Sequence, residues 1–147
     1  MPRRGERLYR YLWHAEVRRR RCQRPCYAID RLCKSTVARA EGIVNAARAY
    51  VHDAVGRAWE AFQAGNPDPT PLITQARLAI THGIHEAVRA VDLVFHAAGT
   101  NAVYTRNPLE RHFRDIHVAV QHGAALPGHF ESAGKALMGV RPNDPGW

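Results

Sequence analysis

The chain has 147 residues, which is room for one domain with one core. It holds no run of about 18 or more uninterrupted apolar residues, and no apolar segment follows its first arginines, so we expect neither a membrane span nor a secretory signal. Its 3 cysteines, an odd number, favour reduced thiols and a cytoplasmic location.

The net charge of +8 is concentrated at the start of the chain. Residues 1–34 hold 11 Lys and Arg against 3 Asp and Glu, whereas residues 35–147 hold 10 of each. The same segment carries all three cysteines and shows no sustained helical period of apolar residues. We therefore predict a basic leader, residues 1–35, that is loosely ordered or acts as a docking arm. Its run Arg18–Arg21 is accompanied by no aromatic platform and no DNA-reading motif, so a nucleic-acid partner is not expected.

Residues 36–140 are predicted to form a helical bundle domain, followed by a tail at residues 141–147. Apolar residues recur at helical spacing over residues 36–64, until "AGNPDPTP" interrupts the pattern. Thr70 followed by proline is typical of a capped helix start, so a second helix is expected over residues 71–98.

The predicted second helix has a wide apolar face and a polar reverse face. The polar face consists of His82, His85, Arg89, Asp92 and His96. His82 and His85 could form half of a metal site, but zinc needs further ligands that this spacing does not supply. We favour surface or interface histidines and expect no metal site, while a small metal or haem bundle built on this pair stays open as an alternative.

Asn107, Pro108 and Glu110 form a capping-box pattern, which predicts a third helix from Pro108 to near Gly123. A short fourth helix is expected over residues 127–138. No segment alternates polar and apolar residues at every second position with turn signals, so strands are not expected. The predicted fold class is all-α: an antiparallel four-helix up-and-down bundle with a basic N-terminal leader.

Three histidines, His112, His117 and His122, recur at steps of five residues in the predicted third helix. Each step turns a helix by about 140°, so the three rings point in different directions and cannot bind one metal together. His122 would lie nearly opposite the apolar stripe, on a face suited to contact with something outside this helix. Asp115 would share that face, at a distance that allows only weak orientation of His122. The apolar stripe consists of Leu109, Phe113, Ile116 and Val120.

Residues 91–122, "VDLVFHAAGTNAVYTRNPLERHFRDIHVAVQH", carry an ordered set of short motifs. The set comprises Ala98-Gly99-Thr100, Asn107-Pro108-Leu109, Arg114-Asp115 and Gln121-His122. This order resembles the C-terminal domain of the acyl-CoA dehydrogenase superfamily. It is most similar to the flavin-dependent monooxygenase branch, whose members hydroxylate phenols and related aromatics with reduced flavin. Fainter similarity extends over about residues 37–140.

The resemblance implies a bundle that packs into a homotetramer and roles for particular residues. Gly99, Thr100 and Asn101 become candidate flavin contacts, because the corresponding loop of the family lies close to the flavin. His122 would lie near the flavin ring and assist the oxygen chemistry by hydrogen bonding or proton transfer, which suits a group that titrates near neutrality. Arg114 and Asp115 would support the helix that carries it.

The resemblance also separates two branches of the superfamily. The dehydrogenases often place a catalytic glutamate near the position of His122, whereas Gly123 follows here and no carboxylate lies between Asp115 and Glu131. This departure favours the oxygenase branch.

The complete family has an N-terminal helical domain and a middle β-domain, which this chain lacks. The expected function is therefore that of a C-terminal domain or fragment of a two-component monooxygenase. Such an enzyme would use O₂ and reduced flavin, FMN or FAD, in the complete assembly, with a flavin reductase as its partner. We expect no activity from the chain alone. Two alternatives stay open: a fragment of an acyl-CoA dehydrogenase-type oxidoreductase, and a non-catalytic interaction module with a basic docking arm.

Overall fold

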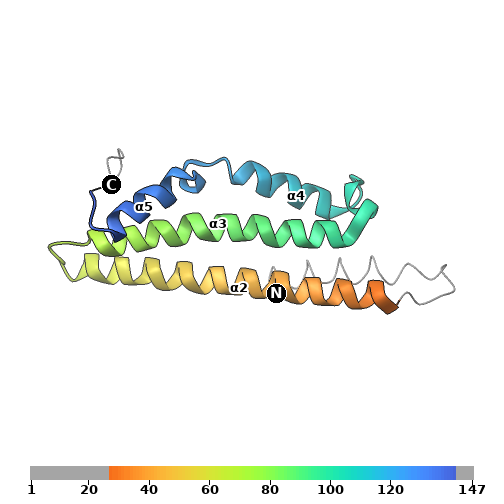
Figure 1. The fold of residues 1–147 in the computed structure, drawn as a ribbon, viewed down its shortest axis with the longest axis horizontal. Helices are drawn as coiled ribbons and strands as arrows, with labels where there is room; N and C mark the ends of the chain where they lie inside the picture. Colours follow the sequence, from red (N-terminus) through yellow and green to blue (C-terminus); the bar gives the residue numbers. More distant parts are fainter. Residues whose placement is uncertain (1–26, 142–147) are drawn as a thin grey trace.

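A computed structural model describes residues 27–141, and every regular element in that range is helical (Figure 1). The elements are α2 (Tyr27–Gln63), α3 (Thr70–Ala98), the 3₁₀ helix η1 (Gly99–Val103), α4 (Pro108–Ala119), the 3₁₀ helix η2 (Gly123–Ala125) and α5 (Gly128–Leu137). The predicted all-α class with four helices is confirmed over this range. None of the described helices is long and apolar enough to cross a membrane.

α2 begins at Tyr27, nine residues before the predicted start at Thr36. No proline or glycine occurs in residues 26–41, so nothing in the backbone prevents the helix from extending backwards. The half-buried Cys33 lies against α3, where its Sγ donates to the carbonyl oxygen of Ala97 at 3.8 Å. The last part of the predicted leader is therefore helical and belongs to the bundle. The rest of the leader, together with most of the predicted tail, lies outside the described residues.

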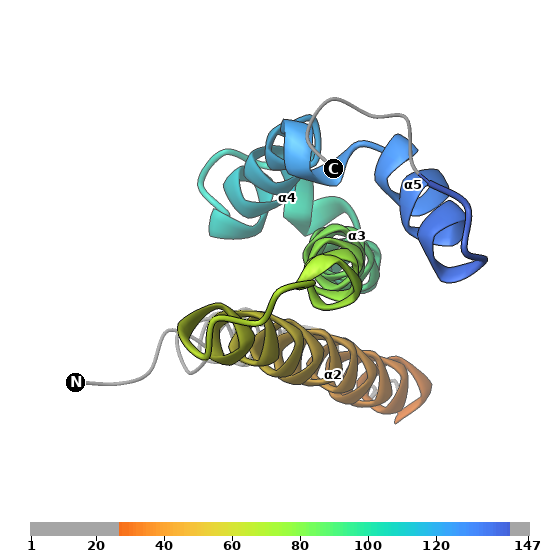
Figure 2. The same cartoon turned by 90° about the vertical axis from the view of Figure 1, so that its left-hand side faces the viewer.

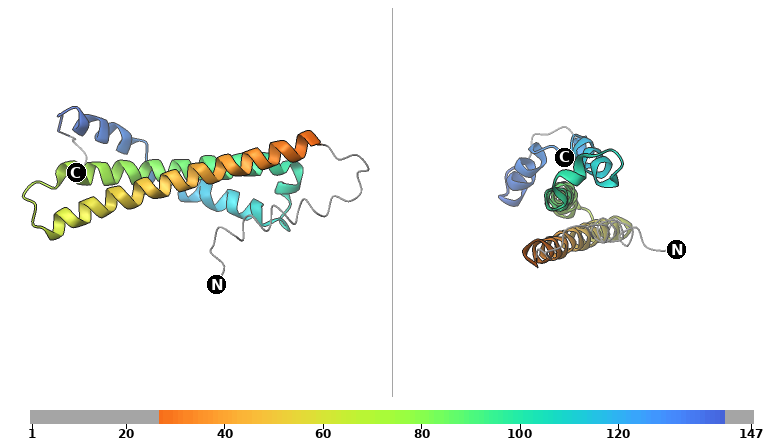
Figure 3. Two further views of the ribbon diagram at one scale, coloured as in Figure 1. Left: turned by 90° about the horizontal axis from the view of Figure 1, so that it is seen from below. Right: turned by 90° about the vertical axis from the view of Figure 1, so that its right-hand side faces the viewer.

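α3 lies at the centre of the fold. α2 runs antiparallel to it on one side, and α4 and α5 pack against its other side (Figures 1 and 2). α4 and α5 follow one another along α3 in the same direction, so the fourth helix continues the third instead of turning back beside it (Figure 3). Because α3 is covered from both sides, part of its predicted polar face is shielded from solvent: His82, His85 and Asp92 are half-buried, whereas Arg89 and His96 are exposed.

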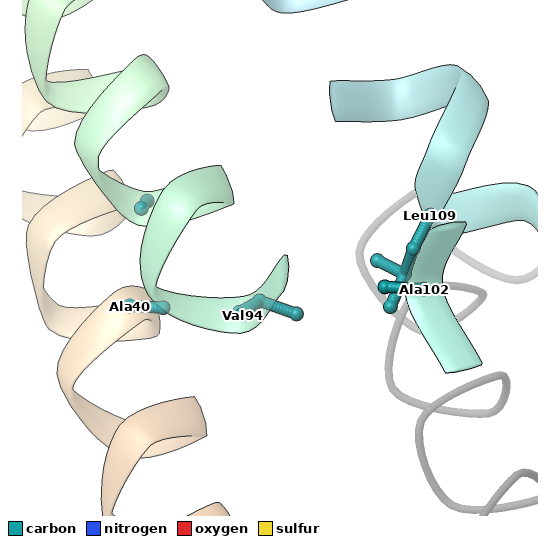
Figure 4. Close-up of a cluster of buried hydrophobic side chains, with 5 residues drawn as sticks. Ala40, Val94, Ala102 and Leu109 are labelled. Atoms are coloured by element: carbon teal, nitrogen blue, oxygen red, sulfur yellow. The ribbon is translucent and has the colours of Figure 1, made fainter. Parts of the chain in front are cut away.

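The core is built mainly from small side chains. Figure 4 shows Ala40 from α2, Val94 from α3, Ala102 from η1 and Leu109 from α4, which belong to one buried cluster. Larger apolar side chains, such as Phe95, are only partly buried around this cluster. The buried apolar residues of the described range are Ala40, Ala47, Ala54, Ala79, Ala90, Val94, Ala102, Leu109, Ala125 and Ala133.

The starts of α3 and α4 are capped in different ways. The side-chain oxygen of Asn107 accepts from the N–H of Leu109 at 3.0 Å, and Pro108 follows it in the first turn, as predicted. Thr70 does not cap α3, because it is itself the first helical residue. Its N–H donates to Oδ1 of Asp68 at 3.2 Å, so Asp68 takes the role that the sequence pattern assigns to Thr70.

α2 and α3 are in tight contact at Gly83. A Cβ atom added to Gly83 would lie 2.9 Å from Cγ2 of Val51, which is closer than carbon atoms pack. Gly42, also in a helix, has no atom within 4 Å of the equivalent position. The two glycines therefore differ in their surroundings but not in their secondary structure.

We predict opposite effects from alanine at these two positions. Gly42→Ala should raise the free energy of unfolding by about 0.5–1 kcal/mol, because alanine loses less backbone entropy in a helix. Gly83→Ala should lower it by about 1 kcal/mol, because the cost of overpacking exceeds that gain. Urea denaturation of each variant measures the difference. Adding Val51→Ala should relieve the crowding and remove most of the additional penalty, and no relief would mean that the helices are not in contact at Gly83.

Candidate functional site

α4 ends at Ala119, before it reaches the predicted end near Gly123. The N–H of Val120 still donates to Ile116, but the N–H of His122 donates to Ala119, three residues back, at 3.0 Å. This change of spacing tightens the final turn and closes the helix. The backbone of His122 is then extended, with φ −65° and ψ 146°, so the helical position predicted for His122 is wrong.

His122 instead caps the short η2 turn with its ring. Its Nδ1 accepts from the N–H of Ala124 at 3.2 Å, and its side chain is exposed. A ring nitrogen that accepts a hydrogen bond carries no hydrogen, so the neutral ring of His122 holds its hydrogen on Nε2. Among the described residues no partner contacts Nε2, which leaves this N–H available to donate to a bound molecule.

Three side chains hold the carbonyl groups of η2. Thr81 Oγ1 donates to Ala124 O at 2.9 Å. His85 Nε2 donates to Ala125 O at 2.9 Å, and His129 Nε2 donates to Gly123 O at 2.7 Å. We call these side chains, Thr81 and His85 from α3 and His129 from α5, the η2 clamp. The sequence patterns did not indicate a role for Thr81 or His129. The bond of Thr81 spans 43 residues, and the bond of His129 spans six residues across a turn, so neither follows a helical period.

Arg114 and Asp115 lie on the exposed side of α4 and do not pair with one another. Nη1 of Arg114 lies 3.7 Å from Oε1 of Glu110, and Oδ2 of Asp115 lies 3.5 Å from Nε of Arg111. The side chains of Arg114 and Asp115 are 63% and 59% exposed, so these pairs add little stability. Since His122 has left the helix, Asp115 does not share a helical face with it.

The predicted flavin contacts lie at the end of α3. Gly99 has φ +59°, which favours glycine, and its N–H donates to the carbonyl of His96 at the helix end. That N–H is therefore not available to a phosphate, and the negative end of the helix dipole would also disfavour one. Thr100 and Asn101 are exposed, so their side chains could donate to carbonyl or hydroxyl oxygens of a flavin. The loop fits a polar contact with the flavin but not a phosphate cradle at Gly99.

The two parts of the predicted site lie apart. η1 precedes α4 and His122 follows it, so the twelve residues of α4 separate them (Figure 1). At 1.5 Å per residue this helix is roughly 18 Å long. The structure therefore brings the η1 residues and His122 to opposite ends of α4 and not into one pocket of this chain.

Side chains in the middle of α4 join it to α3. His117 Nε2 lies 3.0 Å from Oδ1 of Asp92, and the ring of Phe113 stacks on Phe95 with 4.1 Å between centroids. Phe113 also contacts the ring of His117, at 4.4 Å between centroids. These contacts fix the orientation of α4, which leads to His122.

The histidines proposed as half of a metal site contact different elements. His82 packs edge-on against Tyr50 of α2, whereas His85 faces Phe130 of α5 in addition to its bond to η2. Over residues 27–141 no group of three or more His, Cys, Asp or Glu side chains lies close enough to hold a metal ion.

Glu131 of α5 has a shifted acidity. Its Oε1 lies 2.6 Å from Nζ of Lys135, and this hydrogen bond, together with the positive charge, lowers the pKa of the Glu131 carboxyl below its ordinary value. A carboxyl whose pKa is lowered by folding stabilises the folded state at any pH above its ordinary pKa. This contribution is lost as the pH falls through the lowered pKa. Because both side chains of this pair are largely exposed, its contribution to α5 at neutral pH is small.

Two solved structures share this arrangement of helices. The HsaA monooxygenase from M. tuberculosis superimposes with a TM-score of 0.74 at 24% identity, over 92% of this chain and 35% of that chain. The 3-HSA hydroxylase from Rhodococcus sp. RHA1 superimposes with a TM-score of 0.79 at 25% identity, over 91% of this chain and 35% of that chain. The fold is thus that of the helical domain in these two enzymes.

The family described as "Acyl-CoA dehydrogenase, C-terminal domain" matches residues 11–127. The chain belongs to this family. The match begins inside the predicted leader, not near residue 37 where the similarity was expected to start, so the charge break at residue 35 does not mark the family boundary either.

Curated relatives are monooxygenases and hydroxylases. The indole-3-acetate monooxygenase of Pseudomonas putida is 30% identical over 118 residues, which is 80% of this chain and 30% of the relative. The pigment production hydroxylase of Rhodococcus erythropolis is 28% identical over 110 residues, or 74% and 28% of the two chains. The oxygenase subunit HsaA of a flavin-dependent monooxygenase from Mycobacterium tuberculosis is 26% identical over 116 residues, or 78% and 29%. The chain thus spans less than a third of the length of these relatives.

We predict that His122 contributes little to stability and Phe113 contributes more. His122→Ala removes an exposed ring and one cap, so the free energy of unfolding should fall by about 1 kcal/mol or less. Phe113→Ala should cost about 2 kcal/mol, below the range for a fully buried ring, because Phe113 is only half-buried against Phe95. Urea denaturation of both variants measures this order, and a reversed order would place His122 in the core.

Proposed function

We propose that this chain supplies the C-terminal helical domain of a two-component flavin-dependent monooxygenase that hydroxylates an aromatic substrate. Such a reaction uses reduced flavin, FMN or FAD, to give two electrons to O₂: one oxygen atom enters the substrate and the other leaves as water. The family match and the activities named for the relatives support this class. The observation that carries the proposal is the ring of His122, exposed beyond α4 with Nδ1 engaged and Nε2–H turned to no protein partner among the described residues.

In this proposal His122 donates a hydrogen bond or a proton from Nε2 to the reacting group. The bond from the N–H of Ala124 to Nδ1 keeps the neutral ring in the form that has its hydrogen on Nε2. His122 therefore begins the cycle as a donor. The absence of a carboxylate between Asp115 and Glu131 favours this chemistry over removal of a substrate proton by a glutamate.

The exposed side chains of Thr100 and Asn101 hold polar groups of the flavin in the same proposal, and Gly99 leaves room for its approach. Arg114 and Asp115 form only weak, exposed pairs along α4, so their supporting role in this proposal is minor. Because η1 and His122 lie at opposite ends of α4, the pocket between them is completed by parts outside this chain. These parts are an N-terminal domain, a middle domain or a further copy. A separate reductase supplies the reduced flavin, which fits the description of one relative as an oxygenase subunit.

We further propose that the assembly is a homotetramer in the cytoplasm. The support is a set of large apolar side chains that are exposed near the ends of α2 and α5, two helices that finish at the same end of the bundle (Figure 1). Phe62 is 72% exposed and Met138 is 82% exposed, and Trp59 stacks on Phe62 with 6.1 Å between centroids. Side chains of this size are rarely left in water together unless a partner covers them.

We predict that Phe62→Glu weakens self-association of the full chain. A charge at this exposed position should change the free energy of unfolding by less than about 0.5 kcal/mol but disfavour a buried contact. Sedimentation velocity at micromolar concentration measures the change. Gln63→Glu is the matched control, since it adds the same charge at the next residue without removing apolar surface. A wild-type chain that sediments as a monomer would contradict the tetramer.

We predict that His122→Ala disables hydroxylation in the complete enzyme. The chain is assembled with the N-terminal and middle domains, and product is measured per reduced flavin consumed. Loss of a positioned acid–base group should lower hydroxylation by ~10²–10⁴-fold, while flavin affinity, measured by fluorescence quenching, changes little.

The control for this experiment is His112→Ala, which removes an exposed histidine from α4. It should leave hydroxylation near the wild-type rate. Wild-type activity in the His122→Ala enzyme would remove His122 from the mechanism, and an assembly without affinity for reduced flavin would remove the proposed class.

A further inference from the structure

The three carbonyl groups of η2 each accept a hydrogen bond from a side chain of another element. Thr81, His85 and His129 donate to Ala124 O, Ala125 O and Gly123 O, at 2.9, 2.9 and 2.7 Å. A turn of three residues on a protein surface ordinarily leaves its carbonyls to water. The η2 clamp therefore adds three side-chain bonds to the two backbone bonds of this turn, Ala125 N–H to His122 O and Leu126 N–H to Gly123 O.

The hydroxyl of Thr81 bonds to η2 and not to its own helix. A threonine inside a helix commonly donates to the carbonyl four residues before it, as Thr74 does to Thr70 at 2.9 Å. Thr81 lies on the same helix and is equally buried, at 1% exposure against 2% for Thr74. Its hydroxyl nevertheless donates to Ala124, 43 residues away in the sequence.

His129 is connected to His122 through one peptide unit. The carbonyl that accepts from His129 and the N–H that donates to Nδ1 of His122 belong to the peptide between Gly123 and Ala124. A trans peptide is planar, so its C=O and N–H point in opposite directions, and no cis peptide occurs in the described range. Fixing the carbonyl with His129 therefore aims the N–H of Ala124 at His122, and hydrogen bonds in such a chain polarise one another.

The ring of His129 is suited to act only as a donor here. Its Nε2 donates to the carbonyl of Gly123, while its Nδ1 is buried and has no partner among the described residues. The Nε2 hydrogen of His129 is therefore directed at η2.

We propose that Thr81, His85 and His129 are positioning residues for His122. They hold η2 so that the N–H of Ala124 binds Nδ1 and the hydrogen of His122 stays on Nε2, where it meets the bound reactants. The proposal rests on the function proposed above for His122, and the bond between Ala124 and His122 can be measured without that function.

The first experiment measures amide hydrogen exchange at Ala124 in the ¹⁵N-labelled full chain. In Thr81→Val and His129→Leu this amide should exchange about tenfold faster or more, the factor that corresponds to one lost hydrogen bond. Thr74→Val removes a buried hydroxyl from the same helix without touching η2, so exchange at Ala124 should stay at the wild-type rate. His129→Gln keeps an N–H donor and should restore most of the protection.

The second experiment uses the complete enzyme and a double-mutant cycle. His129→Leu should lower hydroxylation, but it should add no further loss in an enzyme that already carries His122→Ala, because the two act as one unit. If His122→Ala leaves hydroxylation intact, the proposed function fails, and the exchange experiment alone decides the clamp. Unchanged exchange at Ala124 in both clamp variants would overturn the proposal. So would an equal loss from His129→Leu with and without His122. If circular dichroism shows that His129→Leu does not fold, the exchange rates of Ala124 in Thr81→Val and His129→Gln test the proposal instead.

Discussion

The fold depends on the close approach of α2 to α3. At Gly83 there is no space for even one more carbon atom beside Val51, and the buried residues of α2 and α3 are mostly alanine. Small residues let two long helices run side by side at short distance, which leaves the opposite side of α3 to α4 and α5. With α3 contacted from both sides, polar groups such as Asp92 and His85 are placed among packed helices and must be paired there.

Helical periodicity and capping chemistry were sufficient to predict the main elements of the bundle. The apolar spacing of α2 and α3 and the Asn107-Pro108 start of α4 depend only on residues that are close together in the sequence. Such patterns can be recognised without knowing the tertiary structure. The start of α2 was misplaced because the charge break at residue 35 was interpreted as a structural boundary. Charge on a helix surface says little about where that helix begins, whereas the absence of proline and glycine over residues 26–41 says more.

The candidate site was predictable only in part. Short motifs indicated Gly99, Thr100, Asn101 and His122, but a helical wheel cannot place a residue that follows the end of its helix. α4 ends at Ala119 because backbone bonds to the carbonyl three residues back, and the capping bond to the ring of His122, replace further α-helical bonds. The sequence gives little indication of either bond. The η2 clamp joins positions 40 or more residues apart, or two short helices across a turn, so no periodic pattern reports it.

A core made of alanine has a thermodynamic consequence for the chain as a separate molecule. Unfolding exposes less new apolar surface when the buried side chains are small. For a chain of this length, both the heat-capacity change of unfolding and the slope of the unfolding free energy against denaturant concentration should therefore be low. The larger apolar side chains, such as Phe62 and Met138, bury their surface only when another subunit or domain covers them. In the proposed assembly, folding of this chain would therefore be linked to association, and its melting temperature would rise with protein concentration.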